Sequence, residues 1–308
     1  MFTSMLDEDD EDLRMFTNDV GGSLFGNQAL DSLYDEVTRH INLLKHADLS
    51  KRVDSLVSLN ETIGGMSEET QPVLVRASNE LIGAFTHVMI DIFAKPTEEI
   101  NLRFAKYFIS IVLKTCSCRE IMSAVNRERL FDFAEQLLTR LLIEGLDKAG
   151  ENKEGEMVLK NLNSSMLRIL ENCNHTHIIC VLVDLQRKYR DYASMPKVPN
   201  LIVKCVLKIS KIIEKLIDRI EVEQVLLSMH EYMLVINHES RTQNDDTGIK
   251  MLKTVLNEII KFKGDTIWQS YEVIKCHNQQ DQHIFKWIDI ILKSLRGGAS
   301  AGTALQIV

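Results

Sequence analysis

"PNLIVKCVLKISKIIEKL", residues Pro199 to Leu216, contains four lysines within an otherwise almost continuous apolar run. An α-helix turns by ~100° per residue, so these four lysines would fall within an arc of about 60°. Apolar side chains cover most of the remaining circumference. Because a helix on the outside of a globule has a narrower apolar stripe, the pattern predicts a helix with neighbours on several sides and one thin basic edge in water. The four lysines are Lys204, Lys208, Lys211 and Lys215.

The same helical periodicity continues along most of the chain, and no segment alternates apolar and polar residues for long enough to indicate a strand. Twelve helices grouped into six pairs give a period of about 45 residues, which is typical of HEAT and armadillo solenoids. In a solenoid each pair is covered by the pairs before and after it. We therefore expect an all-α fold, a HEAT-repeat α-solenoid of about six helix pairs. The predicted helices are 28–45, 48–63, 67–93, 97–115, 127–147, 154–172, 174–192, 197–216, 220–237, 245–263, 264–275 and 281–295.

The composition and charge of the chain exclude some classes of function. The 308 residues are 45% hydrophobic and 26% charged, which is typical of a folded globular protein. The formal net charge of −8 argues against a dedicated nucleic-acid surface, which needs clustered Lys and Arg. Charges interrupt every long helix, so no apolar run approaches the roughly 18 residues of a membrane span. We expect neither a nucleic acid nor a membrane as partner.

The two ends differ from the middle. Residues 1–26 contain six consecutive acids from Asp7 to Asp12, followed by Gly21, Gly22 and Gly26. Such a segment is typical of a solvated acidic linker without stable structure. Residues 297–308 are rich in Gly, Ala and Ser and predict a flexible tail. This leaves residues 27–296 for the helical domain.

No motif of catalysis occurs: phosphate-binding loops, nucleophile elbows and zincin helices are all absent from the sequence. The stretch "CNHTHIIC" holds Cys173, His175, His177 and Cys180, but it lacks the paired spacing of a structural zinc site. We interpret it as a turn between helices, with Asn174 or Thr176 as the N-cap and Cys180 in the core. The six cysteines are interpreted as reduced cytosolic thiols. We expect no enzyme, no catalytic residue, no metal and no cofactor.

Aromatic residues gather late in the chain, as Trp268, Tyr271, Phe285 and Trp287. In the last predicted helix, an apolar stripe at the spacing i, i+3, i+4, i+7 has no later repeat to cover it. One interpretation is that the stripe packs inward on the preceding helix. The other is that it accepts a partner helix, because an apolar groove accepts apolar side chains at the same spacing. The stripe consists of Ile284, Trp287, Ile288 and Ile291, which are the predicted partner-binding residues.

The order of three late stretches resembles the C-terminal folded region of the TOG-array microtubule polymerases of the ch-TOG and Mini spindles type. These stretches are "MPKVPNLIVKCVLKISKIIEKL", "IEVEQVLLSMHEYMLVI" and "IKMLKTVLNEIIKFKGDTIWQSYEVI". Upstream, "LYDEVTRHINLLKHADLSKRVDSLVSLNETI" resembles the helix pair that opens that region, and an acidic linker precedes it. The resemblance covers roughly residues 28–295 as a match of pattern over length.

The resemblance implies a TOG-like HEAT domain from a protein of microtubule plus ends and spindle poles. Tubulin-gripping TOG domains typically present a tryptophan in the turn inside the first helix pair, and their later turns add basic residues along one narrow edge. Here the corresponding turn has His46 and the candidate tubulin edge of Lys45, Lys51 and Arg52, but no tryptophan. This departure argues against tight tubulin binding and leaves weak contact with tubulin or microtubules as the expectation.

The C-terminal region of the family is associated with targeting through TACC-type coiled-coil proteins. We therefore expect a non-catalytic interaction and targeting module of a plus-end polymerase, located in the cytoplasm on the cytoskeleton, at spindle poles, centrosomes and plus ends. The alternative is a general HEAT-repeat adaptor whose concave face holds an unrelated peptide or protein.

Overall fold

The computed structural model describes residues 28–150, 153–190, 192–238, 246–277 and 283–298. Within these ranges the regular structure is helical throughout, without a β-strand. The predicted all-α solenoid of the HEAT type is confirmed. The predicted linker at 1–26 and almost all of the predicted tail at 297–308 lie outside the described residues, so those domain boundaries stay predictions.

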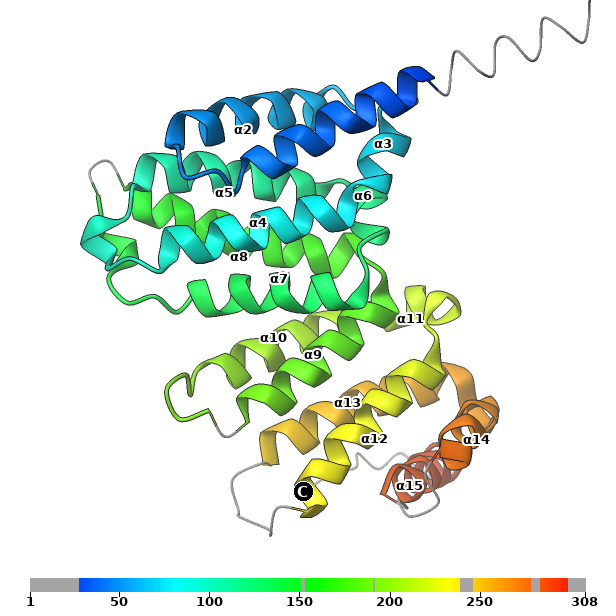
Figure 1. Ribbon diagram of the computed structural model, residues 1–308. Helices are drawn as coiled ribbons and strands as arrows, with labels where there is room; N and C mark the ends of the chain where they lie inside the picture. The colour runs from blue at the N-terminus through cyan, green and yellow to red at the C-terminus, as the bar shows by residue number, and fades with distance from the viewer. Residues whose placement is uncertain (1–27, 151–152, 191, 239–245, 278–282, 299–308) are drawn as a thin grey trace, which may run out of the picture.

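The long helices follow one another as antiparallel pairs (Figure 1). Residues 28–43 pair with α2 (Leu49–Gly64), and the next two pairs are α4 (Ser78–Phe93) with α5 (Leu102–Ser117) and α7 (Arg127–Arg140) with α8 (Glu154–Asn172). Three further pairs are α9 (His175–Tyr189) with α10 (Val198–Ser210), α12 (Val222–His238) with α13 (Asp246–Lys263), and α14 (Ile267–His277) with α15 (His283–Gly298). Shorter elements in the connections are α3 (Gln71–Arg76), α6 (Arg119–Ser123), α11 (Ile213–Leu216), η1 (Thr97–Glu99), η2 (Leu146–Lys148), η3 (Ile217–Arg219) and η4 (Gly264–Thr266).

The pairs stack so that the helices form two layers. In one layer α4, α7, α9, α12 and α14 pack on one another in this order, and in the other layer α2, α5, α8, α10, α13 and α15 do the same. Each inner helix therefore has neighbours on both sides within its layer and a third neighbour in the other layer. This arrangement explains the wide apolar circumference that the sequence shows in α10 and in other inner helices.

Side-chain caps fix where several helices begin. Asp48 accepts a hydrogen bond from the Ser50 backbone N–H at 2.9 Å, and Asn101, Asn126 and Asn174 accept one from the residue three positions later. Such caps satisfy backbone N–H groups that have no partner within the helix. These four caps begin the helices α2, α5, α7 and α9, so the turns that precede them have a defined geometry.

Two predicted helices are interrupted in the structure. The predicted helix 67–93 breaks at Ala77, which ends α3 and precedes α4, so that α3 can pack against α6. The predicted helix 197–216 ends at Ser210, and α11 then buries Ile213 against α13 before the chain turns into α12. As expected, Lys204 and Lys208 are exposed. However, Lys211 and Lys215 lie beyond α10, so the four lysines do not form one edge of a single helix.

Apolar side chains hold the second pair together, and its helix α5 forms the joint with the third pair. Phe108 is fully buried in α5 and meets Phe85 of α4 edge to face, with ring centroids 5.6 Å apart. Phe104 stacks on Phe108 at 6.4 Å, and α5 packs along α8 over much of its length. Aromatic pairs at these distances add stability beyond the area that they bury.

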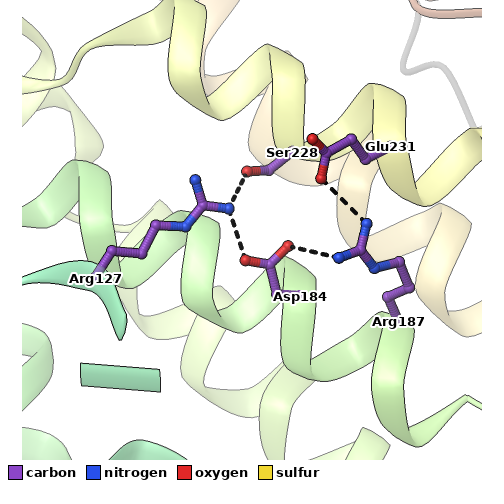
Figure 2. Close-up of polar contacts among 5 residues, drawn as sticks. All are labelled: Arg127, Asp184, Arg187, Ser228 and Glu231. Carbon is purple, nitrogen blue, oxygen red and sulfur yellow. Dashed lines mark hydrogen bonds and ion pairs between the residues drawn. The ribbon is translucent and has the colours of Figure 1, made fainter. Parts of the chain in front are cut away.

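A polar network joins the third, fourth and fifth pairs instead (Figure 2). Arg127 of α7 donates to Asp184 of α9 at 2.6 Å and to Ser228 of α12 at 2.8 Å. Arg187 lies 3.6 Å from Asp184 and donates to Glu231 of α12 at 3.2 Å. Burial opposes the charge of Arg127, yet its hydrogen bond to Asp184 keeps the pKa of this guanidinium above its ordinary value. The network therefore fixes three successive helices of one layer by charge-assisted hydrogen bonds.

Candidate functional site

The turns inside the first four helix pairs lie along one edge of the solenoid. Their described residues are 44–48, 94–101, 141–150 and 192–197, and Figure 1 shows them on the left side of the view. A stack of pairs brings such turns together although they are about 45 residues apart in sequence. This turn edge contains the predicted tubulin-contacting residues.

A groove of about 650 Å³ lies between the first two turns. Lys45 and Leu49 line it from the first turn and the start of α2, and Lys95 lines it from the second turn. Phe104 and Ile92 contribute apolar surface. The groove combines cationic side chains with an apolar floor, which suits an acidic protein surface that carries an apolar side chain.

The three predicted edge residues differ in their surroundings. Lys45 and Lys51 are exposed, and the Lys51 Nζ lies 3.4 Å from the His46 Nε2. Arg52 is 13% exposed, forms an ion pair with Asp91 at 2.5 Å and donates to the Leu44 carbonyl at 2.8 Å. Because Asp91 lies on α4, Arg52 fixes the first turn against the second pair. Contact of these residues with tubulin stays a prediction.

Leu49 and Lys95 were not singled out by sequence reasoning. Leu49 is 43% exposed and lines the groove, although it lies seven residues before the buried Leu56 on the same helix face. Periodicity therefore assigns Leu49 to the core, and its position in the first turn of α2 leaves it in solvent. For Lys95 the sequence offers no signal, because a single lysine in a turn is ordinary.

Positive charge does not continue along the turn edge. A second groove of about 610 Å³, between the second and third turns, is lined by Glu98, Glu144 and Glu154 as well as by Arg103 and Lys148. The charges there are mixed and partly paired, since Lys106 lies 3.6 Å from Glu154. The groove between the second and third turns thus has mixed charge, whereas the groove between the first two turns is mainly basic.

The predicted partner-binding stripe of α15 lies mostly in the core. Ile284, Ile288 and Ile291 are at most 8% exposed, because α15 packs against α13 and α12. Trp287 is partly buried, and the Lys253 Nζ lies 5.5 Å from its ring centroid. The structure thus matches the inward-packing interpretation of the stripe, and Trp287 is the member that solvent reaches.

Other apolar side chains of the last pair are exposed. Phe285 is 45% exposed and lies against Trp268, with ring centroids 5.0 Å apart, and against Tyr271 at 5.7 Å. The same pair exposes three more large apolar side chains, 41–61% of each: Val273, Ile290 and Leu295. The last pair therefore presents apolar surface on sides other than the predicted stripe.

The Cys/His stretch forms a helix start. Asn174 caps α9 by accepting from the His177 N–H at 3.1 Å, and Cys180 is buried, as predicted. Thr176, the other N-cap candidate, accepts from the Glu221 N–H at 2.9 Å and so ties α9 to the next pair. Within the described ranges no group of three His, Cys, Asp or Glu side chains could hold a metal ion.

The thiols of this region are not activated. Burial raises the pKa of Cys116 and of Cys173 far above the ordinary value. A buried cysteine with a raised pKa keeps its proton and is a poor nucleophile.

Across the described helices, none is long and apolar enough to cross a membrane.

Comparison with known proteins identifies relatives of the chain. It is 27% identical to the protein MOR1 of Arabidopsis thaliana over 239 residues, which are 72% of this chain and 12% of MOR1. It is 27% identical to the protein mini spindles of Drosophila melanogaster over 143 residues, 46% of this chain and 7% of that protein. Identity to the centrosomal protein 224 of Dictyostelium discoideum is 21% over 254 residues, 77% of this chain and 12% of that protein. No family model matches the chain, and no solved structure matches it.

These relatives confirm the resemblance to the TOG-array microtubule polymerases. The chain spans about an eighth of the length of MOR1. The names of two relatives refer to the spindle and the centrosome. A coiled-coil partner and a role in targeting stay predictions.

Proposed function

We propose that this chain, a relative of the TOG-array microtubule polymerases, is a non-catalytic module that targets such a polymerase to spindle poles, centrosomes and plus ends. In this proposal a TACC-type coiled-coil protein is the main partner, and contact with tubulin is weak. The observation that carries the proposal is the similarity to MOR1 over 72% of the chain, to centrosomal protein 224 over 77% and to mini spindles over 46%.

The partner docks on the last helix pair. This pair exposes Phe285, Ile290 and Leu295 of α15 and Val273 of α14, an unusual density of large apolar side chains for so short a segment. Coiled-coil helices present apolar side chains in a regular stripe, and such a stripe can pack on an apolar surface of this kind. Trp287 lies at the margin of the surface, whereas Ile284, Ile288 and Ile291 support it from below.

Tubulin contacts the first two turns weakly. Lys45 and Lys51 are exposed there, but the guanidinium of Arg52 is neutralised by Asp91. The first turn contains no tryptophan, and the exposed apolar side chain next to it is Leu49. Exposed charge pairs contribute only ~0–1 kcal/mol each and are screened by salt. We therefore expect the contact with tubulin to be weak and sensitive to salt.

Titration calorimetry of the purified chain with a TACC coiled coil tests the proposal. The double variant Phe285→Ser/Ile290→Ser changes only exposed side chains and should weaken binding by about tenfold or more, which corresponds to ~1.4 kcal/mol. The variant Lys45→Glu/Lys51→Glu serves as the matched surface control and should change the affinity less than about twofold. Trp287→Ser should have an intermediate effect.

Each variant is compared only if its helicity and melting temperature stay near those of the wild-type chain. If a folded Phe285→Ser/Ile290→Ser variant binds with wild-type affinity, the last pair is ruled out as the docking surface. Absence of any binding by the wild-type chain would favour the general adaptor instead.

A further inference from the structure

A third groove lies at the joint between the third and fourth helix pairs, where α8 and α10 run side by side. Its volume is about 220 Å³, and the end of α7 closes it below. The helix α10 is the one whose wide apolar circumference the sequence shows. The groove marks the place where this circumference is not covered by a neighbouring helix.

The inside of this α8/α10 groove is apolar. Leu138 of α7, Met166 of α8 and Cys205 of α10 are buried and form its floor. Leu167 and Leu201 are partly exposed and form its walls. The volume suits one or two apolar side chains of a docked segment, and not a whole helix.

The border of the groove is basic. Lys204 and Lys208 line it from α10, both are exposed, and neither forms an ion pair within the described part of the chain. Lys160 lies one turn before the lining residue Asn163 on α8 and is also exposed. No Asp or Glu lines the groove. The first groove of the turn edge differs, because its arginine already has an aspartate partner.

We propose that the acidic segment Leu6 to Phe16 of the same chain occupies the α8/α10 groove. This segment reads "LDEDDEDLRMF" and places six acids from Asp7 to Asp12 beside apolar residues at both ends. The acids complement Lys204 and Lys208, and Leu13 or Phe16 enters the groove. Charge complementarity selects this occupant, because it has the most concentrated negative charge in the chain.

The chain between this segment and the first helix is long enough. Two to three interhelical steps of 8–10 Å separate the first pair from the groove, which amounts to roughly 25 Å. The length of α10 adds at most roughly 20 Å at right angles to this direction. Residues 17–27, when extended, span roughly 36 Å, and Gly21, Gly22 and Gly26 permit the turns that the path requires.

Hydrogen–deuterium exchange of the full chain tests this docking. Amides of residues 6–16 should exchange about fivefold more slowly in the wild-type chain than in the Lys204→Glu/Lys208→Glu variant, since docking protects backbone amides. The Lys45→Glu/Lys51→Glu variant reverses the same charge elsewhere and should leave this protection unchanged. Equal exchange in the wild type and in Lys204→Glu/Lys208→Glu would overturn the proposal, as would loss of protection in Lys45→Glu/Lys51→Glu alone.

Zero-length cross-linking of carboxylates to lysines then identifies the contact. In an equal mixture of ¹⁴N- and ¹⁵N-labelled chains, cross-links from residues 7–12 to Lys204 or Lys208 should join peptides of the same isotope and should disappear at high salt. Cross-links between unlike isotopes would assign the groove to a second copy and overturn docking within one chain. Cross-links to Lys45, Lys51 or Lys95 alone would also contradict it.

Discussion

The joint between the second and third helix pairs and the joint between the third and fourth are built differently. The first is closed by packing along α5 and α8, and the rings of Phe85 and Phe108 fix α5 against α4 within the second pair. At the second joint the α8/α10 groove stays open on one face, and the Arg127–Asp184 network ties the other. Apolar packing of this kind fixes the relative position of two helices through the close fit of their side chains. A polar network fixes it through directional hydrogen bonds and depends on the charges of its members.

The difference indicates which parts of the solenoid tolerate change. The N-terminal pairs form a continuous apolar unit, whose turn edge is held rigidly by contacts such as Arg52 with Asp91. The C-terminal pairs depend more on polar ties and expose more apolar surface at their end. Substitutions that remove apolar packing should therefore affect the N-terminal pairs most, and substitutions that remove polar contacts should affect the C-terminal pairs most.

Removal of a ring from the apolar core of the second pair, beside the closed joint, should have the largest effect. Phe108→Ala deletes a fully buried ring and should lower the free energy of unfolding by about 3–5 kcal/mol. Phe262→Ala is the matched control, because Phe262 is 43% exposed on α13 and its loss should cost less than about 0.5 kcal/mol. Urea denaturation followed by circular dichroism measures both. Similar losses for the two variants would contradict the assignment of Phe108 to the apolar core of the second pair.

Disruption of the polar joint should come second. Asp184→Ala leaves Arg127 and Arg187 without their shared carboxylate and should cost about 1–2 kcal/mol of unfolding free energy. A double-mutant cycle with Arg127→Ala should show that the two losses are not additive.

The control for this polar joint is Asp289→Ala, which breaks the exposed pair of Asp289 with Lys293 and should cost less than about 0.5 kcal/mol. If Asp184→Ala is no more destabilising than this control, the network does not hold the joint.

Acid should weaken the fourth pair through His175. Burial, followed by the charges of Arg119 and Arg219, lowers the pKa of this side chain. In the unfolded chain the ordinary histidine pKa is about 6.5, so below that pH the unfolded state binds more protons than the folded state. The unfolding free energy should therefore decrease as the pH falls below about 6.5.

His175→Gln should flatten this part of the pH profile measured by thermal unfolding. The exposed His87→Gln serves as the control and should leave the profile as it is. An unchanged slope in His175→Gln would assign the acid sensitivity to other groups.

The smallest expected effect concerns the turn edge. Lys45→Glu/Lys51→Glu should reduce co-sedimentation with microtubules at low salt by the equivalent of ~0–1 kcal/mol per charge pair and should have no effect at high salt. Nanomolar tubulin binding by the wild-type chain that persists at high salt would contradict the weak contact proposed for this edge.

Much of the fold could be predicted from the sequence, because helical periodicity and local breakers are short-range signals. The boundaries of α8 and α13 agree closely with the predicted helices 154–172 and 245–263. The predicted helix 127–147 was too long, since α7 ends at Arg140 and Gly145 adopts a left-handed conformation in the turn. The break at Ala77 could not be predicted, because it depends on the packing of α3 against α6.

The candidate sites were less predictable, because they depend on residues far apart in sequence. Arg52 was assigned to the tubulin edge from its place in the turn, whereas its partner Asp91 lies 39 residues later. Similarly, the spacing of Ile284, Ile288 and Ile291 defines an apolar stripe but not whether α13 covers it. The α8/α10 groove arises from the spacing of two helices, for which the sequence contains no local signal.

Recruitment to spindle poles tests the central claim most directly, namely that the last helix pair and not the turn edge targets the protein. Fluorescently tagged chains are compared in mitotic cells: wild type, Phe285→Ser/Ile290→Ser and Lys45→Glu/Lys51→Glu, at equal expression. We predict that the pole signal is lost in the first variant and retained in the second. Retention in Phe285→Ser/Ile290→Ser together with loss in Lys45→Glu/Lys51→Glu would contradict the account.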